Sequence, residues 1–188
     1  MSYKPPNQVD DYNFKKIVAI LRIMTPYTGL ILTTREAPDF RRELLKIGVS
    51  QMSAGSRTYP GAYGDSRANL PDKQQFTIGD TRSLDEVIRD LAESQGYIPS
   101  FCTACYRLGR TGDHFMGLAK SSFIHQFCRP NALLTFKEYL VDYASDRTKA
   151  AGDELISREV TASSGDPRYG TILERLKKID EGARDLYF

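Results

Sequence analysis

The chain has 188 residues, of which 40% are apolar and 27% charged, ordinary values for a globular protein. Its formal net charge is only +2, so we expect neither nucleic acid nor an anionic membrane surface as a partner. No apolar run approaches the roughly 20 residues of a membrane span. The polar, proline-containing first residues do not resemble a secretory signal, and we therefore expect a cytoplasmic protein with reduced cysteines.

Apolar spacing predicts alternating helices and strands over the first hundred residues. A helix capped by Asp10 or Asp11 carries an apolar stripe of Phe14, Ile17, Leu21 and Met24, and Pro26 ends it. A second helix opens at Pro38 and stops at Gly48. Strands are predicted at residues 28–34, 49–53 and 97–102, with a possible edge segment at 75–78. A turn-rich loop spans residues 55–74, and a capping box from Ser83 to Glu86 opens a third helix.

From Arg107 onward the sequence contains only helical patterns. Helices are predicted at residues 112–120, from a second capping box at Thr135, at 148–159 and at 167–180. Alternating α and β elements favour a parallel sheet, with functional groups at the carboxyl ends of its strands. Three strands are too few to close a barrel, so the chain resembles the C-terminal part of something larger.

All three cysteines lie within 27 positions, as Cys102, Cys105 and Cys128 in a Cys-x2-Cys-x22-Cys pattern. Thiolates bind iron–sulfur clusters and zinc, and an iron–sulfur cube normally takes four cysteines. Three thiolates would leave one iron open to another ligand. A zinc site could instead use the same cysteines with His125, as a closed Cys3His structural centre. A redox Cys-x-x-Cys pair and inert thiols remain further alternatives.

Two polar groups could serve such a centre. Arg107 and Arg110 follow the first two cysteines and could tune a negatively charged cluster or bind an anionic substrate. Equally, they could pair with the surface carboxylates Asp113 or Asp85. Small residues and an arginine also follow the second predicted strand, at the position where a β/α scaffold places its active site: Ser53, Ser56 and Arg57. Their plainer alternative is a tight β–α turn with an exposed salt bridge.

Several segments together resemble one family: Ser50–Thr58, Gly96–Arg107, Gly109–Gly112, Pro130–Thr135 and Arg184–Phe188. The sequence is similar, from about Pro5 onward, to the C-terminal part of the radical S-adenosylmethionine tyrosine lyase of FeFe-hydrogenase maturation, the HydG family. The related tyrosine lyase of thiamine biosynthesis shares the general layout of this region but lacks the three cysteines, and biotin synthase is a more distant relative.

The resemblance implies an α/β fold: the C-terminal part of a β/α barrel over residues 1–101, with about three parallel strands, and a helical cluster domain over 102–188. It implies that Cys102, Cys105 and Cys128 ligate an auxiliary 4Fe-4S cluster, with an additional iron beyond it. Arg107 and Arg110 would surround this cluster. Ser53, Ser56 and Arg57 would border the tyrosine and S-adenosylmethionine cavity.

The implied parent enzyme cleaves tyrosine to p-cresol and dehydroglycine, and this tyrosine-derived molecule becomes carbon monoxide and cyanide for the hydrogenase cofactor. Its partners would include the missing N-terminal half of the barrel and other hydrogenase maturation proteins. A second 4Fe-4S cluster, which cleaves S-adenosylmethionine, binds a Cys-x3-Cys-x2-Cys motif in the family. This chain has no such motif, and we expect that alone it cannot cleave tyrosine.

Overall fold

The computed structural model describes residues 6–64 and 75–188, and the chain divides into two compact units, Met1–Leu84 and Asp85–Phe188. The predicted domain boundary at residues 101 and 102 falls inside the second unit, because Ile88 and Ala92 pack into that unit's helical core. Within the described ranges, no helix is both long and apolar enough to cross a bilayer.

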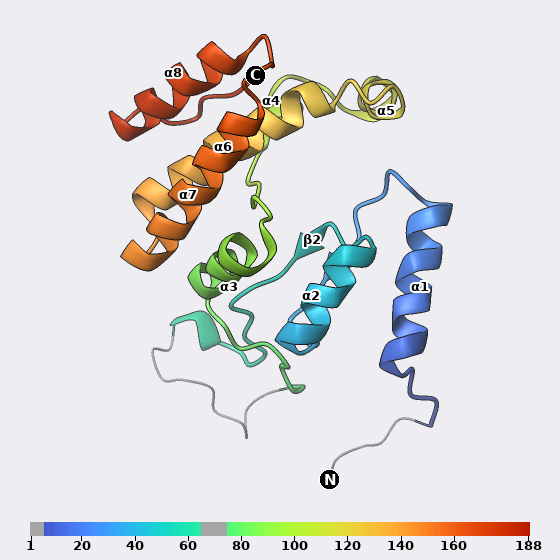
Figure 1. Cartoon of the computed structure of the whole chain (residues 1–188). Helices are drawn as coiled ribbons and strands as arrows, with labels where there is room; N and C mark the ends of the chain where they lie inside the picture. The colour runs from blue at the N-terminus through green and yellow to red at the C-terminus, as the bar shows by residue number, and fades with distance from the viewer. Residues whose placement is uncertain (1–5, 65–74) are drawn as a thin grey trace. The chain divides into compact units, whose positions relative to one another are not determined.

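In its described residues the first unit contains two α-helices, a short 3-10 helix and a two-stranded parallel sheet (Figure 1). Its elements are α1 (Asp11–Met24), β1 (Ile31–Leu32), α2 (Pro38–Ile47), β2 (Gln51–Met52) and the short 3-10 helix η1 (Ala62–Gly64). The predicted cap of α1 is confirmed, since the Asp10 carboxylate accepts a hydrogen bond from the Asn13 N–H at 2.8 Å. Gly48 ends α2 at φ 125°, a conformation that favours glycine.

The core of the first unit lies where the two helices meet the sheet. Val18, Leu32, Leu44 and Val49 are buried there. The predicted stripe of α1 is therefore wrong in part, because Phe14 and Val18 face this core while Ile17, Leu21 and Met24 are exposed. Likewise β1 is covered on one face only, with Leu32 buried and Ile31 67% exposed. Residues 65–74 of the predicted loop lie outside the described residues.

The second unit is helical, as predicted for the chain beyond Arg107 (Figure 1). Its helices are α3 (Leu84–Asp90), continued by the π-helical turn η3 (Leu91–Gln95), α4 (Ala104–Arg107), α5 (Gly112–Lys120), α6 (His125–Asp142), α7 (Asp146–Ala162) and α8 (Tyr169–Asp180). α6 packs against both α7 and α8, so its apolar residues are buried on several sides, among them Leu133, Leu134, Phe136 and Leu140.

Pro130 stands inside α6 without breaking it. Proline has no N–H, so the carbonyl oxygen of Gln126, four residues earlier, loses its usual helical partner. The guanidinium of Arg168 donates a hydrogen bond to this oxygen and so replaces the missing donor. Asp166 orients Arg168 through two side-chain hydrogen bonds, at 3.0 and 2.7 Å. The turn before α8 thereby stabilises the start of α6.

Three predicted elements are wrong. Residues 75–78 and 97–102 are not strands, and α6 begins at His125 rather than at Thr135. The segment 97–102 is extended, but Pro99 lacks an N–H and the Phe101 N–H donates to the Thr135 hydroxyl at 3.2 Å instead of to a strand. Thr135 does not cap a helix, because its hydroxyl bonds to the Asn131 carbonyl oxygen one turn earlier, at 3.0 Å.

Candidate metal centre

Cys102 and Cys105 lie on the turn that leads into and forms α4. The Ala104 N–H lies 3.4 Å from the Cys102 sulfur and donates a hydrogen bond to it. Ala104 itself is buried. Just before this turn the Phe101 ring stacks on Tyr139 of α6, with centroids 5.5 Å apart. The first two cysteines are thus held against the central helix of the second unit.

Cys128 lies in the first turn of α6, where its N–H donates to the Ile124 carbonyl oxygen at 3.0 Å. Atoms packed around the sulfur raise the pKa of Cys128 by desolvation, and the Cys105 and Cys102 thiols raise this pKa further. Arg110 acts in the opposite direction on the same pKa. The Cys102–Cys105 turn and the first turn of α6 therefore both act on the pKa of one thiol, while the convergence of the three sulfurs on one metal centre stays a prediction.

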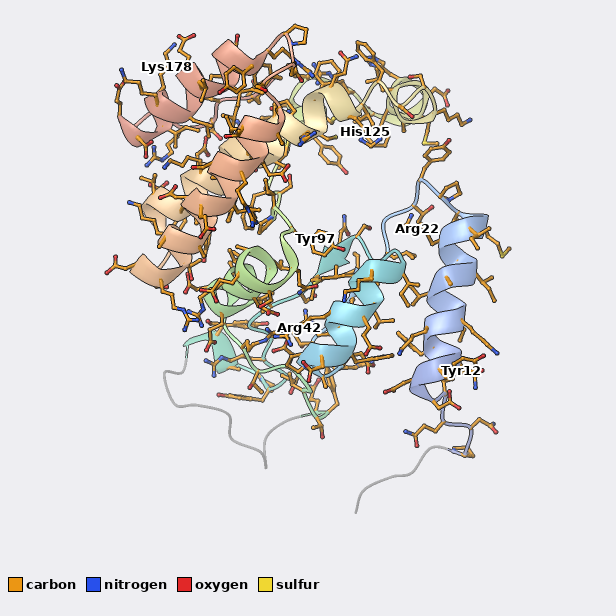
Figure 2. The ribbon with its side chains drawn as sticks, viewed as in Figure 1. Tyr12, Arg22, Arg42, Tyr97, His125 and Lys178 are labelled. Atoms are coloured by element: carbon orange, nitrogen blue, oxygen red, sulfur yellow. The ribbon has the colours of Figure 1, made fainter. Side chains whose placement is uncertain are left out.

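His125 is the first residue of α6, one turn ahead of Cys128 (Figure 2). In residues 6–64 and 75–188 no group of three or more His, Cys, Asp or Glu side chains is arranged so that it could hold one metal ion. The ligand set of the zinc alternative and that of the cluster both stay predictions.

Arg107 and Arg110 contact the C-terminal segment, not the carboxylates Asp113 and Asp85 considered as alternatives. Arg107 forms an ion pair with Asp185 at 3.0 Å. Arg110 lies over the Phe127 ring, 4.0 Å from its centroid, and donates to the main-chain oxygen of Phe188 at 3.3 Å. Of the two arginines, Arg110 is the one that acts electrostatically on Cys128.

The segment Arg184–Phe188 contributed to the family resemblance, but its contacts within the second unit were not predicted from the sequence. Arg184 binds Asp142 of α6, and Arg175 of α8 donates to the Tyr187 carbonyl oxygen at 2.8 Å. Asn131, buried within α6, accepts from the Phe188 N–H at 2.8 Å and donates to its oxygen at 3.4 Å. An asparagine inside an apolar helical pattern is the sequence signal that could have indicated this contact, because a buried amide needs hydrogen-bond partners.

The strand-end group lies in the first unit. The Ser53 N–H donates to the Leu32 carbonyl oxygen at 2.9 Å, while the main-chain carbonyl oxygen of Ser53 accepts a hydrogen bond from the Arg41 guanidinium. The Arg57 main-chain N–H donates to the Tyr63 hydroxyl at 3.2 Å, and among the described residues its buried Nη1 atom has no hydrogen-bond partner. Ser56 lies on the same loop, and its role stays a prediction.

A buried ion cluster supports this loop, and the sequence did not predict it. Arg41 is fully buried and pairs with Asp80, which also accepts from Arg82 at 2.9 and 2.7 Å. Burial acts to raise the pKa of Asp80, but the bonds from Arg82 and the charge of Arg41 outweigh it, so this pKa is lowered. An ionised Asp80 thus fixes Arg41, and Arg41 fixes the Ser53 carbonyl group at the end of β2.

Each of three comparisons with known proteins gives matches. The family described as the Biotin and Thiamin Synthesis associated domain matches residues 3–98. The 2-iminoacetate synthases of Escherichia coli (strain K12) and Salmonella typhimurium (strain LT2) are 32% and 31% identical over 96 residues, which is 51% of this chain and 24% of theirs. The crystal structure of HydG, a maturase of the FeFe-hydrogenase, matches with a TM-score of 0.88 and 50% identity, over 97% of this chain and 39% of that chain.

The family match and the HydG match cover different lengths of this chain. The family match ends at residue 98, before Cys102, whereas the HydG match leaves only 3% of the chain uncovered. The cysteine-bearing unit is therefore part of what this chain shares with HydG. The chain spans well under half the length of each relative. The resemblance to HydG predicted from the sequence is confirmed, and the chain belongs to the Biotin and Thiamin Synthesis associated domain family.

Proposed function

We propose that this chain is the auxiliary-cluster portion of a radical S-adenosylmethionine tyrosine lyase that acts in FeFe-hydrogenase maturation. The observation that carries the proposal is the Cys-x2-Cys-x22-Cys pattern of Cys102, Cys105 and Cys128, which lies within the part of the chain that matches HydG. Support also comes from the similarity to HydG across nearly the whole chain and to 2-iminoacetate synthases over half of it.

The donor set suits an iron–sulfur cube. Three thiolates would bind three of its irons, and the fourth iron would stay open, since a cube normally takes four cysteines. When bound, this cluster would supply an open iron at which a tyrosine-derived fragment is converted into carbon monoxide and cyanide. The Ala104 N–H donates to the Cys102 sulfur, and the charge of Arg110 acts to lower the pKa of Cys128 against the larger effect of desolvation.

In the first unit, Arg57 and Ser53 suit the recognition of a carboxylate-bearing substrate. The main-chain oxygen of Ser53 is held by Arg41, and the buried Nη1 of Arg57 has no hydrogen-bond partner among the described residues. We propose that Ser53, Ser56 and Arg57 border the tyrosine and S-adenosylmethionine cavity of the parent enzyme. The N-terminal half of the barrel would complete that cavity and would carry the second cluster. The 188-residue chain alone would therefore not cleave tyrosine.

Anaerobic reconstitution of the chain with iron and sulfide tests the proposal. We expect a brown protein with about four or five irons, and iron loss in each of the variants Cys102→Ser, Cys105→Ser and Cys128→Ser. His125→Ala should retain its iron, as should the matched control His114→Ala on α5.

A colourless protein that binds one zinc ion would contradict the proposal. If His125→Ala then released the zinc as completely as a cysteine variant does, the Cys3His structural module would be the better description of the site. Metal analysis and the absorption spectrum of oxygen-free protein distinguish the two results.

A further inference from the structure

Arg110 contacts both segments that carry the cysteines. Its N–H donates to the Cys105 carbonyl oxygen at 2.8 Å, which closes the turn after α4. Its guanidinium lies 4.0 Å from the centroid of the Phe127 ring, and Phe127 immediately precedes Cys128. A guanidinium stacked on an aromatic face gains both electrostatic and dispersion energy. One residue thus joins the Cys102–Cys105 turn to the first turn of α6.

A third contact fixes the direction of this side chain. The Nη1 atom of Arg110 donates to the main-chain oxygen of Phe188 at 3.3 Å. The buried amide of Asn131 holds the N–H and the oxygen of Phe188, and Arg175 lies over the Phe188 ring, 3.9 Å from its centroid. Because its acceptor is itself fixed to α6 and α8, the guanidinium is held in one place before any metal binds.

The charge of Arg110 is permanent, since a guanidinium does not lose its proton in proteins. Its guanidinium lies over the ring of Phe127, the residue before Cys128, while the charge of Arg107 is directed to Asp185 at 3.0 Å. The two arginines therefore differ in role although they are three residues apart. Arg107 offers a natural control, because removing it changes the net charge of the chain equally.

From these contacts we infer that Arg110 is a positioning residue of the metal centre: it ties the two cysteine-bearing segments together and holds a fixed positive charge against Phe127, the residue before Cys128. The second half of this inference rests on the proposed function, because it needs a cluster to act upon. The first half concerns the chain without metal and can be tested by itself.

Two consequences follow. Without the guanidinium, the Cys102–Cys105 turn and the start of α6 lose a shared contact and should open more often. A positive charge beside a cluster stabilises its reduced, more negative form. Loss of that charge should therefore lower the midpoint potential of the cluster, and a lysine should preserve more of the potential than a neutral side chain does.

The experiment compares Arg110→Lys, Arg110→Gln and Arg110→Ala with the control Arg107→Gln. The first measurement is amide hydrogen exchange of the metal-free chain, read in peptides that cover residues 101–111 and 123–131. We expect exchange several-fold faster in both peptides for Arg110→Gln and Arg110→Ala, and a smaller increase for Arg110→Lys. Arg107→Gln should match the parent chain in the 123–131 peptide.

The second measurement is the midpoint potential of each reconstituted protein. Arg110→Gln should have a lower potential than Arg110→Lys, which should lie nearer to the parent and to Arg107→Gln. Neither lysine nor glutamine keeps the planar stack on Phe127, so a purely structural role would shift both variants alike. Equal potentials for the lysine and glutamine variants would overturn the electrostatic part of the inference.

Unchanged exchange in either peptide for both Arg110→Gln and Arg110→Lys would overturn the tie between the two segments. If Arg110→Ala fails to fold, as judged by circular dichroism, these two milder variants still decide the result. If the parent chain takes up no iron, the proposed function and the charge role fail together, while hydrogen exchange still decides whether Arg110 links the two segments.

Discussion

The crossing of α6 and α7 gives a prediction whose size can be worked out from the structure. Gly152 lies on α7 where it passes α6, and it is buried. A Cβ atom added there would lie 2.5 and 2.6 Å from the two terminal methyl groups of Leu140 and 2.9 Å from the Phe136 ring. Carbon atoms in contact normally stand about 3.5–4.0 Å apart. Leu140 and Phe136 are 1% and 0% exposed, so neither side chain can turn outward to make room.

Gly152→Ala therefore has two opposing effects on the free energy of unfolding. Replacing a glycine inside a helix by alanine stabilises it by about 1 kcal/mol. Forcing a methyl group into a filled core costs about 1–3 kcal/mol. We expect a net destabilisation of up to about 2 kcal/mol, because the neighbouring side chains are fully packed. For a unit of this size, 1 kcal/mol shifts the thermal midpoint by about 4–8 °C.

Gly117→Ala is the matched control. Gly117 lies inside α5, is exposed, and has no atom within 4 Å of its added Cβ. This variant should be stabilised by about 1 kcal/mol, so the difference between the two variants measures the steric cost alone. Because the chain has no tryptophan, the unfolding of each variant is best followed by far-UV circular dichroism in urea. If Gly152→Ala were as stable as Gly117→Ala, the close approach of α6 and α7 described here would be wrong.

Two further predictions concern charged groups of the second unit. Burial acts to raise the pKa of Asp85, but hydrogen bonds from groups including the Ser145 hydroxyl outweigh it, so this pKa is lowered. Asp85→Ala should lower the free energy of unfolding by about 2–3 kcal/mol at pH 7. This loss should shrink as pH falls below about 4, where the carboxylate of the parent chain becomes protonated. Urea unfolding at pH 7 and pH 3 tests this, and an equal loss at the two pH values would refute it. Lys137 bonds to Asp153 and Asp180, each at 2.9 Å, and although burial acts to lower its pKa these bonds raise it. Lys137→Met should lower the free energy of unfolding by about 1–2 kcal/mol at pH 8. The loss should become progressively smaller above about pH 11, as the lysine of the parent chain loses its proton. Thermal midpoints at pH 8 and above about pH 11 test this, and a loss that grows with pH would contradict it.

Local signals in the sequence predicted much of the fold. The Asp10 cap, the glycine at the end of α2 and the bounds of α5 depend on residues within a few positions of one another. The parallel pairing of β1 with β2 followed from the strand–helix–strand order. The Cys-x2-Cys-x22-Cys pattern is also visible in the sequence alone. Such features need no knowledge of what packs against them, because their hydrogen bonds and spacing are local.

Only the tertiary structure decided which patterns became elements and which side chains work together. Residues 97–102 do not form a β-strand because the Phe101 N–H bonds to Thr135 and the Phe101 ring stacks on Tyr139. Side chains of α6 thus take the place of a neighbouring strand. Burial between α7 and α8 allows α6 to run through Pro130, whose missing donor Arg168 replaces. The link from Phe188 through Arg110 to Phe127 joins residues far apart in sequence. Contacts of this kind depend on distances between elements, and the periodicity of a single segment contains no information about those distances.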